Sequence, residues 1–114
     1  MKIKKIRQVL KSLADDTRLR IVNLLKKREL NVTQMCQILH AKQSNISKHL
    51  SRLRLTGVVG DRRKGLNVCY YLAGSQEKAH KELINLVTSD FIESEVFKRD
   101  ADKLKQLTKN LKRI

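Results

Sequence analysis

Apolar residues recur every three or four positions over most of the chain, which predicts a largely helical protein. A first helix begins at Ile3 and carries a basic opposite face. Asp15 and Asp16 supply a cap and first-turn negative charge for a second helix, from Thr17 to about Arg28. The apolar side of the first helix consists of Ile6, Val9, Leu10 and Leu13, and the residues expected to face inward from the second helix are Leu19, Ile21, Val22 and Leu25.

Two more helices follow, joined by a connection that is long enough only for a tight turn, His40 to Lys42. Asn31 and Thr33 are cap candidates for the first of them. The second extends from about Gln43 to Thr56 and leaves one side polar and basic. The apolar residues expected to face the core are Met35, Ile38 and Leu39 on the first, and Ile46, Leu50 and Leu53 on the second.

All four glycines fall between Gly57 and Gly74, so the strongest breakers of regular structure lie together. Inside this window, Val58-Val59 and Val68 to Leu72 predict a two-stranded hairpin. The intervening segment, Asp61 to Gly65, is expected to form a cationic tip.

A wide apolar stripe after Ser75 predicts a long helix. The stripe consists of Leu83, Ile84, Val87, Phe91 and Ile92. Leu104, Leu107 and Leu111 either extend this helix or form a separate one. We expect residues 1–97 to form one domain and residues 98–114 to form a C-terminal helical extension.

This order of elements is that of a winged helix-turn-helix, a mainly α fold with a small β-hairpin. A helix fits the DNA major groove, and a basic hairpin reaches flanking phosphates. Asn and Ser are poor choices for a helix interior, so their exposure on the fourth helix favours base reading over a purely structural role. His49 either touches the DNA backbone or packs against the domain. The predicted DNA contacts are Gln43, Ser44, Asn45, Ser47, Lys48, His49 and Arg52 on the helix, with Arg54 further along, and Arg62, Arg63 and Lys64 on the hairpin.

The charge balance supports a polyanionic partner, since 26 Lys and Arg against 11 Asp and Glu give a net charge of +15 over 114 residues. Basic and acidic residues number ten and two in residues 1–28, seven and two in 29–73, and nine and seven in 74–114. The excess therefore lies on the DNA-reading half, and the nearly balanced end suits dimerisation. No apolar run approaches the roughly 18 residues of a membrane span, and no signal peptide precedes the first helix, so we expect a cytoplasmic protein.

Three segments resemble the ArsR/SmtB family of bacterial transcriptional repressors. Leu13 to Ile21 is similar to the opening block of that family, Gln43 to Val59 to its recognition-helix signature, and Tyr70 to Leu72 to the end of its wing. The resemblance covers about Leu10 to Leu72. It implies a homodimer built from the first and last helices, binding to an inverted repeat in a promoter, and release by an inducer.

The metal ligands of the best-known family members are missing. Where family metal sensors carry E-L-C-V-C, this chain reads Glu29 to Thr33 without a cysteine, and the last helices carry His80 as their single histidine. We therefore expect no cofactor and no metal, and expect His80 on the surface or at an interface. Cys36 and His40 have the i, i+4 spacing of two ligands, but two ligands are not a site. Cys36 and Cys69 predict no disulfide.

The sequence thus predicts a homodimeric repressor that binds double-stranded DNA and is released by an inducer. A constitutive DNA-binding protein without an inducer is the alternative, because the metal ligands are missing. Membrane-surface binding through the basic first helix is a third possibility, although we expect no membrane partner. An enzyme is not expected, because no Ser/His/acid, paired-carboxylate or phosphate-loop constellation is found.

Overall fold

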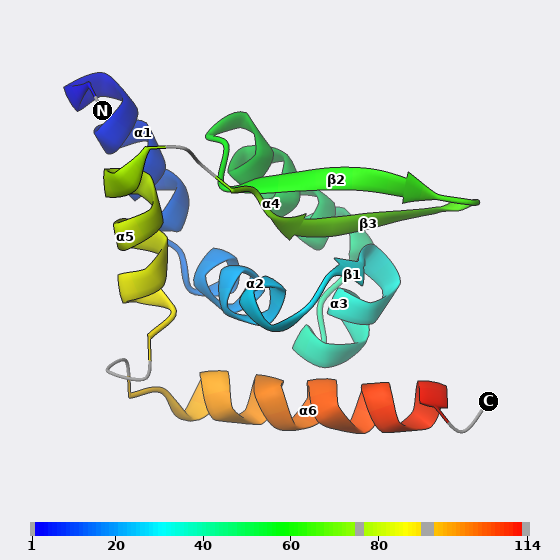
Figure 1. Ribbon diagram of the computed structural model, residues 1–114. Coiled ribbons are helices and arrows are strands. Elements are labelled where there is room, and N and C mark those ends of the chain that lie inside the picture. Colours follow the sequence, from blue (N-terminus) through cyan, green and yellow to red (C-terminus); the bar gives the residue numbers. More distant parts are fainter. Residues whose placement is uncertain (1, 75–76, 90–92, 113–114) are drawn as a thin grey trace.

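A computed structural model describes residues 2–74, 77–89 and 93–112 of the chain. Helices surround a small antiparallel sheet, from which one hairpin extends away from the helical body (Figure 1). This confirms the mainly α, winged helix-turn-helix architecture. The elements are α1 Ile3–Leu13, α2 Asp16–Lys27, β1 Leu30–Asn31, α3 Val32–Leu39, α4 Gln43–Leu55, β2 Val59–Lys64, β3 Asn67–Leu72, α5 Lys78–Val87 and α6 Glu95–Lys112.

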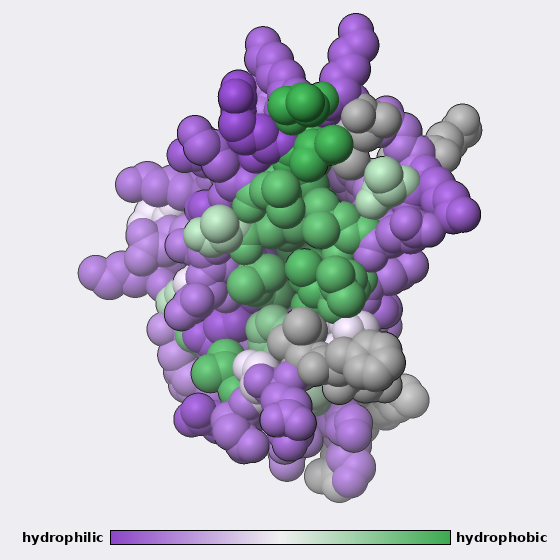
Figure 2. All heavy atoms as spheres, turned by 90° about the vertical axis from the view of Figure 1, so that its left-hand side faces the viewer, coloured by the Kyte–Doolittle hydropathy of each residue, from purple (hydrophilic) through white to green (hydrophobic). Residues whose placement is uncertain are grey.

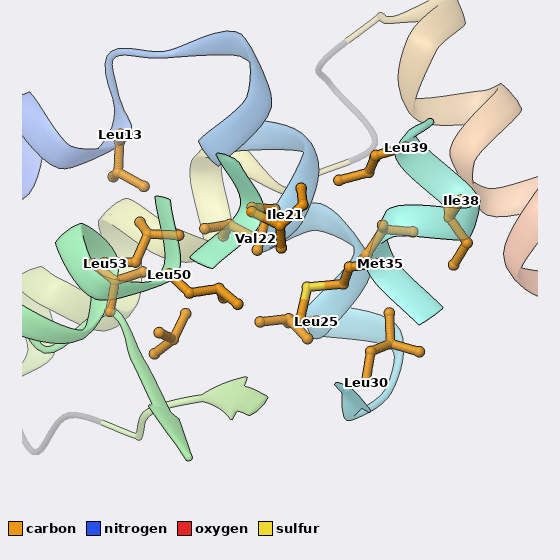
Figure 3. Packing of buried hydrophobic residues seen from close by; sticks show 14 of the residues in the cluster. Leu13, Ile21, Val22, Leu25, Leu30, Met35, Ile38, Leu39, Leu50 and Leu53 are labelled. Carbon is orange, nitrogen blue, oxygen red and sulfur yellow. The ribbon is translucent and has the colours of Figure 1, made fainter. Parts of the chain in front are cut away.

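Helix α2 is the centre of the core. Five consecutive residues, Ile21 to Leu25, are buried, because α1, α4, α6 and the sheet surround the helix. Its apolar side chains meet Met35 of α3 and Leu50 and Leu53 of α4 (Figure 3). The predicted inward positions of α2 are therefore correct but incomplete, since amphipathic spacing does not reveal a helix that is covered on all sides.

Helix α1 divides its apolar residues between two faces. Val9 and Leu13 are buried in the protomer, whereas Leu10 is 47% exposed and Ile3 is 81% exposed. The apolar side predicted for this helix is therefore divided between the core and the outer surface. Ile6 and Leu10, together with Ile3 and Ala14, instead line a shallow apolar depression on the outside of α1.

The helix starts follow from local hydrogen bonds. The Asp15 carboxylate accepts a hydrogen bond of 3.0 Å from the Arg18 backbone N–H, which caps α2. Asn31, rather than Thr33, caps α3, and Asn31 and Gln34 form a reciprocal capping box. His40 ends α3 with a φ of 50°, in the left-handed region that histidine enters more readily than most residues.

The hairpin is longer than predicted. Arg62, Arg63 and Lys64 belong to strand β2, and the turn is formed by Gly65 and Leu66. The expected cationic tip is therefore a cationic strand with an exposed leucine at its turn. Gly65 has a φ of 62° at the first position of the two-residue turn, where a type II′ turn requires glycine. The strand order in the sheet is β1-β3-β2, so β2 lies at the edge. Charged residues are common in edge strands, where they oppose pairing with another chain.

The C-terminal part forms two separate helices, α5 and α6. Phe91 and Ile92 of the predicted stripe lie outside the described residues. Helix α6 begins at Glu95, so the expected boundary between residues 97 and 98 falls in its first turn. It packs on α2 and α3 on the side away from the hairpin (Figure 1). Asp100, which is buried, accepts two hydrogen bonds of 2.9 Å from Arg20 of α2. None of the described helices is long and apolar enough to cross a bilayer.

His80 is buried within the protomer, which corrects the expectation that it lies on the surface. It is 4% exposed, and its Nε2 atom has no hydrogen-bond partner among the described residues. Burial lowers the pKa of His80, and the nearby Lys5 ammonium lowers it further, while Glu77 acts in the opposite direction. His80 is therefore held as a neutral imidazole in the folded protein.

We predict that His80 makes the protein less stable in mild acid. Because its pKa is lower when folded, the unfolded chain binds the proton first, and stability is lost as the pH falls below the ordinary value of 6.5. His80→Leu should flatten the profile of unfolding free energy between about pH 7 and pH 5, measured by urea denaturation. His40→Asn, which removes an exposed imidazole, is the control. Equal profiles for His80→Leu and the natural chain would contradict the assignment.

Candidate nucleic-acid interface

Helix α4 is oriented by its apolar side. Ile46, Leu50 and Leu53 are each at most 1% exposed, and they pack into the core described above. Successive residues of a helix are about 100° apart, so Lys48 and Arg52 lie on the opposite side of α4, and both are exposed. The tight turn of residues 40–42 places α4 across α3, in the position of a recognition helix.

The residues predicted to contact DNA fall into two groups on α4. Ser47 and His49 are half-buried, at the margins of the helix. The exposed ones are Gln43, Ser44, Asn45, Lys48 and Arg52. The structure therefore brings the predicted helix residues together on one surface, with their hydrogen-bonding groups accessible.

One face of the hairpin carries a compact set of contacts around Glu29. The Arg62 guanidinium lies 2.8 Å from one Glu29 carboxylate oxygen, and the Lys64 ammonium lies 2.9 Å from the other. Arg62 also lies over the ring of Tyr71, 4.5 Å from its centroid. A Cβ atom on Gly60 would come within 2.7 Å of the Tyr71 ring, so glycine leaves room for that ring. The hydrogen bond from Lys64 is the main reason that the pKa of Glu29 is lowered.

The other face of the hairpin is directed toward α4. Asp61 and Arg63 alternate with Arg62 and Lys64 along β2, so their side chains lie on the opposite side of the sheet. Asp61 accepts a hydrogen bond of 2.7 Å from Arg54 of α4, which joins the hairpin to the recognition helix. Arg63 has no ion pair with any residue in the described part of the chain. Among the three predicted hairpin cations, Arg63 is therefore the one available to a partner.

His49 is held by the start of α2. A guanidinium nitrogen of Arg18 lies 3.2 Å from Nδ1 of His49, and an Asp15 carboxylate oxygen lies 3.8 Å from the same nitrogen. The hydrogen bond from the Arg18 backbone N–H lowers the pKa of Asp15, an effect that burial opposes and the charge of Arg18 reinforces. Asp15 therefore remains a carboxylate near neutral pH.

The residues that sequence reasoning missed are the ones that hold the predicted contacts in place. Arg18, Glu29, Asp61 and Tyr71 each bind a predicted DNA-contact residue or its neighbour on the same surface. One signal was available: Glu29 and Asp61 are the two acids of residues 29–73, and each is paired with a basic side chain. No comparable signal marks Arg18, whose partner lies 31 positions away.

The cysteines and histidines form no visible metal centre. Cys36 is half-buried against the core, and His40 is exposed at the end of α3. Both cysteines are free thiols. Within residues 2–74, 77–89 and 93–112, no three His, Cys, Asp or Glu side chains lie together in a way that could hold a metal ion.

Comparison with known proteins gives consistent matches. Residues 15–60 match the family described as bacterial regulatory proteins of the arsR type. The chain is 36% identical over 77 residues to the transcriptional activator HlyU of Vibrio cholerae, covering 68% of this chain and 71% of HlyU. It is 39% identical over 79 residues to the transcriptional repressor PagR of Bacillus anthracis, and the match covers 68% of this chain and 79% of PagR. A homodimeric winged helix-turn-helix DNA-binding domain from Mycobacterium bovis superposes with a TM-score of 0.67 at 29% identity, covering 75% of this chain and 76% of that one.

The fold and the exposed polar side of α4 define a winged helix-turn-helix DNA-binding protein. The chain belongs to the ArsR family of bacterial regulatory proteins. It is a DNA-binding transcriptional regulator and not an enzyme, and the resemblance found in its sequence is confirmed.

We predict that the two sides of α4 respond differently to truncation. Leu50→Ala should lower the free energy of unfolding by about 2–5 kcal/mol, because it leaves a cavity in the core. Lys48→Ala removes an exposed side chain and should change that free energy by less than about 0.5 kcal/mol. Urea denaturation of both variants measures the difference. Equal losses would show that the faces of α4 are assigned wrongly.

Proposed function

We propose that this protein is a homodimeric repressor that occupies an inverted-repeat operator and leaves it when an inducer binds. The observation that carries the proposal is the accessible polar side of α4 beside the available Arg63 of the hairpin. On this proposal Ser44, Asn45 and Lys48 lie in the major groove. Arg63 reaches the flanking phosphates. The remaining members of the proposed interface are Gln43, Ser47, His49, Arg52, Arg62 and Lys64.

An exposed apolar face supports the dimer. Ile3 and Leu10 of α1 and Leu86 of α5 are exposed, and Figure 2 shows apolar side chains gathered on this side of the molecule. A contiguous apolar patch with a polar rim is typical of a protein interface. A second copy packed through α1 and α5 is the partner that the homodimeric Mycobacterium bovis domain suggests. Such a dimer would present two recognition helices to major grooves about 34–36 Å apart.

Repression is favoured because a protein seated on promoter DNA blocks polymerase, and PagR is named a repressor. HlyU, by contrast, is named an activator. A constitutive DNA-binding protein without an inducer remains the second candidate, since Glu29 to Thr33 contains no thiolate ligand.

The test is selection of duplexes from a random pool, followed by footprinting and transcription from the selected site. We expect the selected duplexes to contain an inverted repeat, two protomers to bind each site, and transcription from the site to be reduced. Recovery of no preferred duplex would overturn it. Titration of the complex with zinc, arsenite, peroxide and small metabolites then separates an inducible repressor, which is released, from a constitutive binder.

We predict that Arg63→Ala weakens binding to all duplexes alike. Loss of one phosphate contact should reduce the slope of log affinity against log salt by about 0.9. Arg62→Ala should have a smaller effect, because Arg62 is already paired with Glu29. Lys105→Ala on α6 is a control that removes a positive charge far from α4. Fluorescence anisotropy at several salt concentrations gives the slopes, and a loss confined to one sequence would instead show that Arg63 reads bases.

We also predict that Leu10→Lys yields a monomer with an intact fold. The side chain is exposed in the protomer, whereas two added charges would face each other across the proposed interface. Operator affinity should fall at least about tenfold, although the added positive charge by itself favours DNA. Sedimentation velocity and circular dichroism measure assembly and folding. The control is Gln106→Lys on α6, and a Leu10→Lys variant that remains dimeric would exclude this face.

A further inference from the structure

His49 has two ring nitrogens in different surroundings. Nδ1 lies 3.2 Å from a guanidinium nitrogen of Arg18. Nε2 makes no hydrogen bond with a described residue and is accessible to solvent. The side chain as a whole is 23% exposed. One nitrogen is therefore engaged inside the protomer, and the other is open to solvent.

The chemistry of Arg18 decides which nitrogen carries the proton. A guanidinium has N–H donors and no acceptor, so the short contact requires Nδ1 to accept with its lone pair. The hydrogen of the neutral ring must then be on Nε2. The nitrogen that is open to solvent is thus a hydrogen-bond donor.

Arg18 is itself held in a fixed place. Its Nε donates to the Ser12 carbonyl and a terminal nitrogen donates to the Lys11 carbonyl, both in the last turn of α1. Its backbone N–H is bound by Asp15. A cation is favoured at the C-terminal carbonyls of a helix, so α1 keeps the guanidinium directed at His49.

The position of His49 on α4 favours the DNA backbone over the bases. His49 lies about 100° around the helix from Lys48, near the buried side and next to the start of α2. When the exposed side of α4 enters the major groove, the margins of that side lie nearest the phosphate backbones that border the groove. A hydrogen-bond donor at this margin of α4 therefore faces the phosphate backbone rather than the base edges.

We propose that Arg18 is a positioning residue that fixes His49 in the Nε2–H form, and that this uncharged imidazole donates a hydrogen bond to a phosphate oxygen of the bound duplex. The inference rests on the proposed function, because it requires α4 to lie in the groove. It resolves the two roles expected for His49, since the ring packs on the protomer through Nδ1 and binds DNA through Nε2.

The tautomer is tested first, on the natural chain. Long-range proton–nitrogen NMR spectra at about pH 8, where a histidine is ordinarily neutral, distinguish the two forms. We expect the signature of a proton on Nε2 for His49, and partial conversion to the other form in Arg18→Met. A proton on Nδ1 in the natural chain would overturn the proposal whether or not any variant folds.

The phosphate contact is tested with two isosteric variants. In His49→Asn, the amide oxygen lies near the place of Nδ1 and can still accept from Arg18, but the outer donor is lost. In His49→Gln, the amide lies near the place of Nε2 and the donor is kept. We expect about a tenfold loss of affinity for every duplex in His49→Asn and a smaller loss in His49→Gln, with an unchanged melting temperature in His49→Asn.

The salt dependence separates a neutral donor from a charged one. An uncharged contact releases no counterion, so His49→Asn should keep the salt slope, whereas the reference variant Lys48→Ala should reduce it by about 0.9. Unchanged affinity in His49→Asn, or a slope reduced as in Lys48→Ala, would overturn the inference while the proposed function stands. If the natural chain binds no duplex, the proposed function fails and the phosphate contact fails with it.

Discussion

The burial of Ile46, Leu50 and Leu53 against α2 and α3 sets the rotation of α4, and the rest of the binding surface depends on that rotation. Because these three residues place one side of α4 in the core, the residues on the other side of the helix point away from the core, and they are exposed. Arg54 of this side binds Asp61, but the side chains of Ser44, Asn45 and Lys48 form no hydrogen bond or ion pair with the described residues. This separation leaves Ser44, Asn45 and Lys48 free for recognition.

A few acidic residues determine which of the basic side chains on this surface are paired within the protomer. Glu29 and Asp61 hold cations of the hairpin and of α4, so part of the positive charge is used within the protomer. Exposed ion pairs of this kind contribute little to stability, and their main effect is to fix where the long side chains lie. Among the hairpin cations, Arg63 is left available, and it lies on the side of the sheet that faces α4, where its charge adds to the field of that helix.

The sequence predicts the structural features that depend on local periodicity. It does not predict the features that depend on residues far away along the chain. The order of helices and the core side of α4 follow from spacing that needs no knowledge of neighbours. The full length of β2 does not, because a strand of Asp61, Arg62 and Arg63 becomes reasonable only when β3 and Glu29 lie beside it. Leu24 is buried by contacts that α2 makes on all sides, and periodicity alone cannot show them. The contact between Arg18 and His49 likewise exists only in three dimensions.

Helix α1 contributes residues to the exposed apolar face and also contacts the recognition helix α4. Leu10 and Ile3 point away from the protomer, while Val9 and Leu13 point into it. The same helix is joined to the end of α4, because the Thr56 hydroxyl donates to Ser12 at 3.0 Å and the Lys5 ammonium donates to the Thr56 carbonyl at 3.2 Å.

The middle of α4 is joined to α1 as well, through Arg18. A rotation of α4 alone would break buried hydrogen bonds at one point and separate Arg18 from His49 at another, and unmade buried hydrogen bonds are costly. Within a protomer, α1 and α4 therefore form one rigid unit. In the proposed dimer, the separation of the two recognition helices would be determined by how the two copies of α1 pack, so residues on the outer face of α1 would affect DNA binding without touching DNA.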